Sequence, residues 1–229
     1  MAYVFDPIET PSVAVTGTDQ RFPVRRIFCV GRNYAEHALE MGGDPDREPP
    51  FFFTKPADAV VESGTTIPFP KSTNDLHHEV ELVVAIGKEG ENIPVKKALD
   101  HVFGYAVGID LTRRDLQKQA KEKGRPWDSG KAFDQSAPCG AISPRSEIEN
   151  ISTAKIWLTV NEESRQSATI ADLIWSIEEV IAVLSEAFIL KPGDLIYTGT
   201  PAGVGPLFLG DHVTGHVDGL TPIDVKLTS

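Results

Sequence analysis

The stretch His77-His78-Glu79-Val80-Glu81-Leu82-Val83-Val84-Ala85-Ile86 opens with two carboxylates two residues apart and continues as an apolar run. Such a run is typical of a buried β-strand. Because alternate side chains of a strand point to one face, Glu79 and Glu81 are expected to project together. Two like charges at this spacing repel unless a cation lies between them or one takes up a proton. The stretch therefore predicts a buried strand with a metal site at the rim of a sheet.

Composition sets limits on the class of protein. The chain has 229 residues, which suits one domain with a sizeable core, and its formal net charge of −11 argues against nucleic-acid or anionic-lipid partners. No apolar run is long enough to span a bilayer, and the first residues lack the basic-then-apolar build of a signal peptide. Cys29 and Cys139 lie far apart without a CxxC pattern, as expected of free thiols in a reducing compartment. We expect a cytoplasmic protein with no nucleic-acid and no membrane partner.

The pattern of expected elements indicates the fold class. Strands and helices do not alternate regularly enough for a doubly wound sheet, so we predict an α+β, β-rich mixed fold with a single catalytic domain. Residues 1–25 are expected to form a short N-terminal extension packed on a domain of residues 26–229. We expect strands at 26–31, 51–56, 79–86, 102–109, 156–160, 195–197, 212–218 and 223–227, with a hairpin turn at Asn161 after the strand 156–160. We expect helices at 34–41, 94–100, 112–123 and 176–188; a loop follows the first at 42–46, alternating charges indicate a solvated third helix, and a Ser176–Glu179 capping box begins the fourth. A long loop is expected at 124–145.

A third carboxylate, Asp110, follows the expected strand 102–109. With Glu79 and Glu81 it would supply three oxygens, half of the octahedron that Mg²⁺ or Mn²⁺ prefers. Taken alone, the Glu-x-Glu pattern is more often a solvated strand end with salt-bridge partners. His77 and His78 are expected to be neighbours of the site rather than ligands, because an oxygen-rich site suits Mg²⁺ or Mn²⁺.

The expected helix 34–41 carries a candidate general base. His37 and Glu40 stand three residues apart and therefore share a face of that helix, with Asn33 as its expected N-cap. A carboxylate raises the basicity of an imidazole and fixes its tautomer, so the pair could activate water. An ordinary contact on a helix surface is the alternative.

Two glycine-containing segments are candidate anion sites. The spacing from Gly124 to Gly130-Lys131 resembles a P-loop, but Ala132 stands where a serine or threonine should be, which argues against a phosphate cradle. In the segment 198–205, glycines let main-chain N–H groups approach an anion such as a carboxylate, with a tight inter-strand connection as the alternative. The chain has no G-x-S-x-G, H-E-x-x-H or G-x-G-x-x-G motif, which removes the main support for a serine hydrolase, a zinc protease or a dinucleotide-binding enzyme.

Eight segments in order resemble the fumarylacetoacetate hydrolase superfamily, and they cover most of the chain from Arg26 onward. The segments are Gly31-Arg32-Asn33-Tyr34 with His37 and Glu40, Phe53-Thr54-Lys55-Pro56, His77-His78-Glu79-Val80-Glu81-Leu82, Gly108-Ile109-Asp110-Leu111-Thr112, Arg114-Asp115-Leu116-Gln117, Gly124-Arg125-Pro126-Trp127, Gly130-Lys131-Ala132-Phe133-Asp134, and Tyr197-Thr198-Gly199-Thr200-Pro201-Ala202-Gly203-Val204-Gly205.

The resemblance implies a β-roll-like fold, usually a homodimer, with one Mg²⁺ or Mn²⁺ on Glu79, Glu81 and Asp110. His37 and Glu40 match the family's water-activating pair, and Lys131 completes the implied catalytic set. Substrate would be held or polarised by Arg114, Gln117, Thr200 and loop N–H groups including that of Gly199. A distal carboxylate would meet Arg32, Arg47 or Arg125, with nothing in the sequence to choose among them.

Within the family, the length resembles acylpyruvate hydrolases. Segments 3–5, 22–26 and 44–53 look most like bacterial fumarylpyruvate hydrolases of the gentisate route in aromatic catabolism, which implies cleavage of the carbon–carbon bond of 3-fumarylpyruvate to fumarate and pyruvate. The first alternative is decarboxylation of oxaloacetate, or isomerisation of another 2-oxo acid, in the same site. His37 and Glu40 favour hydrolysis, because a decarboxylase has no use for a water-activating base. The more distant alternative is a 2-oxo-acid binding protein without turnover.

Overall fold

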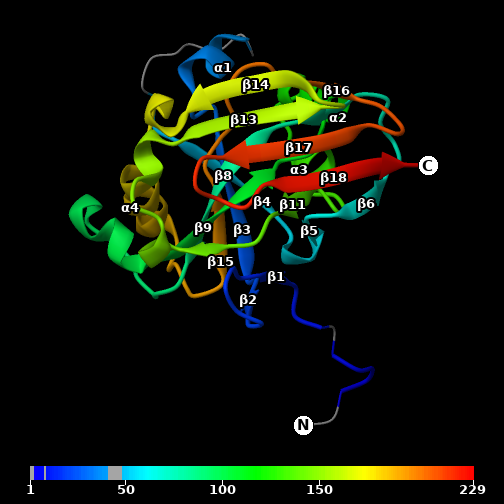
Figure 1. Cartoon of the computed structure of the whole chain (residues 1–229). Helices are drawn as coiled ribbons and strands as arrows, with labels where there is room; N and C mark the ends of the chain where they lie inside the picture. Colours follow the sequence, from blue (N-terminus) through cyan, green and yellow to red (C-terminus); the bar gives the residue numbers. More distant parts are fainter. Residues whose placement is uncertain (1–2, 8, 41–47) are drawn as a thin grey trace.

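Two β-sheets contain most of the strands in a computed structural model (Figure 1). The structure describes residues 3–7, 9–40 and 48–229, without the side chains of residues 38–40, so the expected loop after residue 41 and Arg47 lie outside the described residues. The larger sheet has eight strands in the order β4-β3-β15-β8-β9-β11-β5, with β12 paired to β9. These strands are β3 Arg26–Gly31, β4 Phe51–Lys55, β5 Val60–Glu62, β8 Val80–Ile86, β9 Val102–Ile109, β11 Ala137–Cys139, β12 Ser143–Pro144 and β15 Asp194–Tyr197.

The second sheet has five strands in the order β14-β13-β17-β18-β6. Its hairpin turns at Asn161 and Glu162, whose φ angles of 51° and 69° suit the two central residues of a type I′ turn. The strands of this sheet are β6 Thr65–Pro68, β13 Lys155–Val160, β14 Glu163–Thr169, β17 His212–Val217 and β18 Ile223–Thr228. Two small sheets complete the set, one of β1 Ser12–Ala14 with β2 Arg21–Pro23, the other of β7 Leu76–His78 between β10 Thr112–Arg113 and β16 Gly205–Leu207.

Strand β8 separates the two cores of the protein through the alternation of its side chains. Val80, Leu82 and Val84 belong to the core shared with the five-stranded sheet. Val83 and Ala85 face the other way, into a core to which the β1–β2 hairpin contributes buried side chains. Because the period of a strand is two residues, Glu79 and Glu81 lie on this second face. The β-rich α+β fold predicted from the sequence is confirmed, whereas the domain boundary at residue 26 stays a prediction.

Short helices lie between the strands along the chain. They are α1 Ala35–Glu40, α2 Arg114–Glu122, α3 Asp128–Lys131 and α4 Ile177–Ala187, with short 3₁₀ helices at Ala57–Ala59, Val95–His101, Arg145–Glu147, Ile151–Thr153 and Ile170–Asp172. The predicted capping box of α4 is confirmed, because the Ser176 hydroxyl accepts from the N–H of Glu179, whose carboxylate accepts from the N–H of Ser176. Within the described residues, every helix is too short or too polar to cross a membrane.

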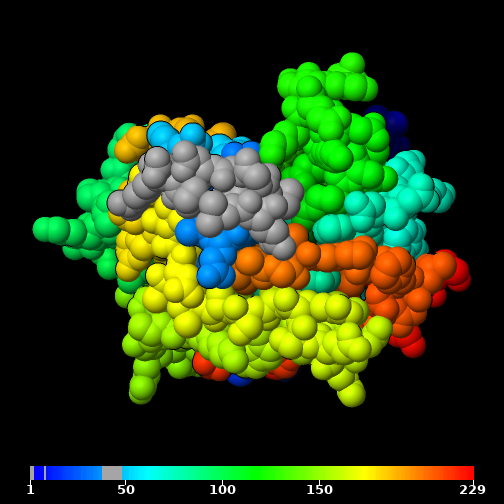
Figure 2. Space-filling model, turned by 90° about the horizontal axis from the view of Figure 1, so that it is seen from above, coloured from blue at the N-terminus to red at the C-terminus, as the bar shows by residue number. Residues whose placement is uncertain are grey.

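Two predicted elements around the site were wrong in detail. The expected loop 124–145 contains α3, β11 and β12, short elements that depend on partners far away in the chain: β11 pairs with β5 and β9. The expected solvated helix 112–123 begins at Arg114 and buries Arg114, Gln117 and Ala120. The alternating charges indicated a solvated helix, but Arg114 can be buried because it pairs with Glu79, which is distant in sequence. Figure 2 shows the face on which α1 (blue) lies, with the α2–α3 segment (green) projecting beside it.

Candidate metal centre and active site

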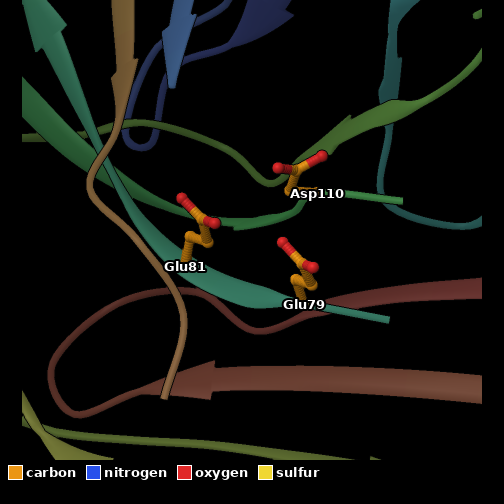
Figure 3. Close-up of side chains that lie close together, drawn as sticks. All are labelled: Glu79, Glu81 and Asp110. Atoms are coloured by element: carbon orange, nitrogen blue, oxygen red, sulfur yellow. The ribbon is translucent and has the colours of Figure 1, made fainter. Parts of the chain in front are cut away.

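Three carboxylates meet where β8 begins and β9 ends. Glu79 precedes β8, Glu81 lies within it opposite Gly108 of β9, and Asp110 directly follows β9. The N–H of Asp110 donates to the carbonyl of Glu79 over 2.8 Å, which extends the ladder to the site. All three side chains are buried, and one carboxylate oxygen of each lies within 4.8 Å of the others. Figure 3 shows the three side chains close together, with Glu79 and Glu81 from one stretch of the chain and Asp110 from the neighbouring one.

Two glycines make this arrangement possible. A Cβ on Gly108 would lie 2.5 Å from the side chain of Val83, so only glycine fits opposite Glu81. Gly199 has φ of +103°, and a Cβ there would lie 2.7 Å from the side chain of Asn33. The N–H of Gly199 donates to Glu81 over 2.8 Å. The structure places this amide against a carboxylate of the triad, and its predicted donation to substrate stays a prediction.

Cationic side chains surround the acids, two of them predicted from the sequence. The ammonium of Lys131 lies 2.7 Å from Glu79, 2.6 Å from Asp110 and 2.7 Å from the hydroxyl of Thr112. Arg114 pairs with the other oxygen of Glu79 and donates to Gln117 over 2.7 Å. Burial favours the neutral form of Lys131, but the adjacent Asp110 and Glu79 outweigh it and raise the pKa of this ammonium. Lys131 is thus held charged at the centre of the site.

Lys55 is a site residue that the sequence reasoning did not identify. Its ammonium is fully buried and lies 2.8 Å from Asp110 Oδ1, while it donates to the carbonyls of Leu111 and Lys131. The available signal was a lysine at the end of the apolar segment Phe51–Phe53, because a buried lysine requires a carboxylate partner. Lys55 therefore supplies Asp110 with a buried counter-charge.

The acids fit a divalent cation on two observations. One carboxylate oxygen from each of the three buried acids lies within 4.8 Å of the others, which gives an all-oxygen donor set of the kind that Mg²⁺ and Mn²⁺ prefer. Burial, followed by the like charges of Asp110 and Glu79, raises the pKa of Glu81 well above its usual range. Burial also disfavours the charge of Glu79, but Lys131 and Arg114 outweigh it and lower the pKa of that carboxyl. A cation among the three would replace the proton that Glu81 otherwise retains.

This proton competition predicts how stability depends on pH. A carboxyl in the unfolded chain has a pKa of about 4.3, and burial raises the pKa of Glu81 above that value in the folded protein. The metal-free protein therefore loses stability as the pH rises from the unfolded-state pKa through the folded-state pKa. The stabilisation that Mn²⁺ confers over EDTA-treated protein should therefore grow between about pH 5 and pH 8. Thermal unfolding with and without Mn²⁺ measures this difference. In Glu81→Gln, whose side chain cannot titrate, the Mn²⁺ stabilisation should not increase over this pH range. An equal increase in that variant would contradict the assignment of the titrating group to Glu81.

The acids open into a pocket that gathers the other predicted residues. Its lining includes His37, Arg32, Arg114, Gln117, Lys131 and Thr200 with the triad. Arg32, at φ of 56°, lies over the ring of Phe51, 5.8 Å from its centroid. The side chain of Glu40 lies outside the described residues, so its pairing with His37 stays a prediction. A wider hollow of about 880 Å³ beside α4 contains none of the triad.

Aromatic side chains and an asparagine shape this pocket without having been predicted. Phe53 and Trp127 line it, and their rings lie 5.8 Å apart between centroids. Asn33 was predicted as the N-cap of the first helix, but α1 begins at Ala35 and the side-chain oxygen of Asn33 accepts from the N–H of Trp175 over 2.8 Å. Its amide nitrogen donates to the carbonyls of Trp175 and Thr198 over 3.0 and 2.8 Å. The N-cap prediction was wrong because the buried side-chain amide of Asn33 bridges two loops that are distant in sequence, and local sequence does not reveal such contacts. Asn33 thereby ties the segment before His37 to the loop that carries Thr200.

Most of this chain matches a known protein family. The family described as fumarylacetoacetate (FAA) hydrolase C-terminal matches residues 26–228. The solved structure of fumarylpyruvate hydrolase from Pseudomonas aeruginosa, in complex with Mn²⁺ and pyruvate, is 52% identical with a TM-score of 0.97, covering 99% of each chain.

Two curated relatives carry different names. Fumarylpyruvate hydrolase from Ralstonia sp is 44% identical over 80% of this chain and 95% of its own. The mitochondrial oxaloacetate tautomerase FAHD1 of Mus musculus is 42% identical over 89% of this chain and 91% of its own. Both matches, like the family match over residues 26–228, span the acidic triad and its cations. The chain belongs to the fumarylacetoacetate hydrolase family.

Proposed function

We propose that this protein hydrolyses the carbon–carbon bond of an acylpyruvate, with 3-fumarylpyruvate as substrate and fumarate and pyruvate as products. The observation that carries the proposal is the buried acidic triad with Lys131, in a chain 52% identical to a fumarylpyruvate hydrolase whose structure contains Mn²⁺ and pyruvate. One Mg²⁺ or Mn²⁺ on Glu79, Glu81 and Asp110 is the proposed cofactor. Oxygen ligands alone suit these two ions.

The charge of the site supports a substrate with two carboxylates. Glu79, Glu81 and Asp110 carry three negative charges when ionised, and Lys55, Lys131 and Arg114 carry three positive charges beside them. A bound divalent cation therefore leaves the centre with a charge of about +2. Fumarylpyruvate carries two carboxylates, so its binding neutralises the site. The overall charge of −11 makes this local excess necessary for an anionic substrate to enter.

The pocket side chains orient the substrate along its length. Arg114, Gln117 and Thr200 line the pocket together with the triad, so they can bind the 1-carboxylate and 2-oxo oxygens of the pyruvyl end. When bound, the cation supplies positive charge that stabilises an enolate at that end. Arg32 lies at the aromatic side of the pocket near Phe51 and is the proposed partner of the distal carboxylate.

Hydrolysis then requires a base and a stabilised leaving group. His37 takes a proton from water, and the water oxygen attacks the distal carbonyl carbon. The carbon–carbon bond breaks with its electron pair on the pyruvyl fragment, which leaves as an enolate and takes a proton to become pyruvate. Lys131, held charged by Glu79 and Asp110, adds positive charge where the enolate forms. Glu40 is the proposed orienting partner of His37.

Tautomerisation of oxaloacetate is the second candidate, because a relative 42% identical to this chain is named oxaloacetate tautomerase. Interconversion of the keto and enol forms uses the same enolate stabilisation but needs no attacking water. Hydrolysis is favoured because His37 lies on the same pocket as the triad, where a base could serve water. A decarboxylase would need neither the base nor the attacking water.

Product identification distinguishes these reactions. The Mn²⁺-loaded protein is incubated separately with fumarylpyruvate, acetylpyruvate and oxaloacetate, and NMR identifies the products. We expect fumarylpyruvate to give fumarate and pyruvate, and acetylpyruvate to give acetate and pyruvate. The kcat/KM for fumarylpyruvate should be higher than that for acetylpyruvate. Enol–keto interconversion of oxaloacetate without cleavage of either acylpyruvate would instead establish the second candidate. Release of CO₂ from oxaloacetate alone would establish a decarboxylase.

The proposal includes the setting implied by the family resemblance. The protein would act as a cytoplasmic homodimer in gentisate-type aromatic catabolism, where fumarylpyruvate is the compound to be cleaved. The Ralstonia relative of that name, 44% identical, supports the substrate. Light scattering during size-exclusion chromatography of the Mn²⁺-loaded protein measures the assembly, and a mass near 24.9 kDa would contradict a dimer.

A further inference from the structure

A fully buried glutamine of β14 joins the start of β8 to the loop that carries Thr200. The side chain of Gln166 is 1% exposed and makes four hydrogen bonds. Its amide lies 3.1 Å from the N–H of Val80 and 3.0 Å from His78 Nδ1 on one side. On the other side it lies 2.7 Å from the hydroxyl of Thr200 and 2.8 Å from the carbonyl of Pro201. Neither the family resemblance nor the proposed mechanism assigns Gln166 a role.

Two backbone groups determine which way this amide points. The N–H of Val80 can only donate, so the amide atom beside it is the oxygen. The carbonyl of Pro201 can only accept, so the atom beside it is the nitrogen. Gln166 Oε1 therefore also accepts from His78, which must carry a hydrogen on Nδ1 whatever the state of Nε2. Gln166 Nε2 likewise donates to the Thr200 oxygen.

The direction of this chain decides what Thr200 offers to a ligand. A hydroxyl has one hydrogen, and the bond from Gln166 uses a lone pair of the Thr200 oxygen. Among the described residues, Gln166 is the one hydrogen-bond partner of this hydroxyl, so its hydrogen is not used within them. Thr200 is 3% exposed and lines the pocket with the triad. Its hydrogen is thus available to an acceptor in that pocket.

We propose that Gln166 is a positioning residue that, together with His78, makes Thr200 a hydrogen-bond donor for a carboxylate oxygen of the substrate. This inference rests on the proposed function for the identity of that carboxylate. The same arrangement explains the buried His78 Nε2, which has no partner among the described residues. With the hydrogen on Nδ1, the unpaired atom is an acceptor, and unpaired buried acceptors are tolerated better than unpaired N–H groups.

The protonation of His78 tests the chain on the wild-type protein without any turnover. The ¹⁵N spectrum of Mn²⁺-free, histidine-labelled protein distinguishes a ring nitrogen that carries hydrogen from one that does not. His78→Asn identifies which signals belong to His78. We expect hydrogen on Nδ1. A His78 with hydrogen on Nε2 alone would require the amide of Gln166 to be reversed and would overturn the proposal.

A double-mutant cycle tests the action through Thr200. Binding of pyruvate to the Mn²⁺-loaded protein is measured by calorimetry for Thr200→Val, Gln166→Met and the double variant. Each single variant should weaken pyruvate binding about 10-fold, since one hydrogen bond to a charged group is lost. The double variant should bind no worse than Thr200→Val alone, because Gln166 has then lost the group through which it acts. Losses that multiply would overturn the proposal.

A neighbouring substitution controls for a general effect on β14. Arg165 is exposed on the same strand and pairs with Glu163, so Arg165→Met should leave pyruvate affinity unchanged. If Gln166→Met fails to fold, the tautomer of His78 in the wild-type protein still decides the question. Failure of the protein to hydrolyse acylpyruvates would reject the proposed function, but it would leave both the tautomer and the binding cycle measurable.

Discussion

Glu81→Gln is expected to abolish turnover and to weaken Mn²⁺ binding by at least about 100-fold. Residues that only support a metal ligand typically cost about 10- to 100-fold in metal affinity when they are replaced, and loss of a direct ligand should cost more. The metal-free variant should remain folded. In the described structure Glu81 receives one hydrogen bond, from the N–H of Gly199, which the amide oxygen of glutamine also accepts. Burial and two like charges already disfavour its ionised form, so a neutral isostere removes a repulsion.

Calorimetric titration with Mn²⁺ and thermal unfolding of the EDTA-treated protein measure these two effects. We expect the metal-free variant to unfold at or above the temperature of the metal-free wild type. Glu163→Gln offers a matched control, because it makes the same change at an exposed strand position and should alter neither quantity. Wild-type Mn²⁺ affinity in Glu81→Gln would show that the cation is not held by this carboxylate. Asp110 is a poorer choice, because its loss would leave Lys55 and Lys131 without a buried counter-charge.

His37→Ala is expected to lower kcat for fumarylpyruvate hydrolysis by about 10²- to 10⁴-fold while leaving Mn²⁺ affinity nearly unchanged. The size of the loss is that of a general base removed from a transition state. His37 lines the pocket, but it does not belong to the candidate metal-ligand set, which consists of Glu79, Glu81 and Asp110. Removing it should therefore affect the proton taken from water and leave the metal ligands in place.

Steady-state kinetics and Mn²⁺ titration of the same preparation separate these contributions. His212→Ala removes an exposed histidine on β17 and serves as the control, with kinetics expected to match the wild type. A decarboxylation of oxaloacetate, if the protein has one, should survive His37→Ala, because that reaction needs no activated water. Unchanged hydrolysis in His37→Ala would remove the base from the mechanism, and a parallel loss of Mn²⁺ would assign His37 a role at the metal instead.

Local pattern was sufficient for some elements because the physical cause is itself local. The Ser176–Glu179 capping box marked the start of α4, since the capping bonds join residues three apart. The Asn161 turn marked the β13–β14 hairpin for the same reason. Segment 124–145 was different, because its strand β11 exists through pairing with β5 and β9. The burial of Arg114 was equally invisible, since its partner Glu79 lies 35 residues earlier in the chain.

The sequence by itself determined the ligand chemistry of this protein. Alternation along β8 placed Glu79 and Glu81 on one face, and residue type alone restricted the ion to one that prefers oxygen. Tertiary structure alone decided how those acids are held: β9 brings Asp110 alongside, the buried Lys55 contacts Asp110, and the N–H of Gly199 donates to Glu81. The reason is that a strand's period acts over neighbouring residues, whereas the direction of a buried hydrogen bond depends on which distant groups surround it.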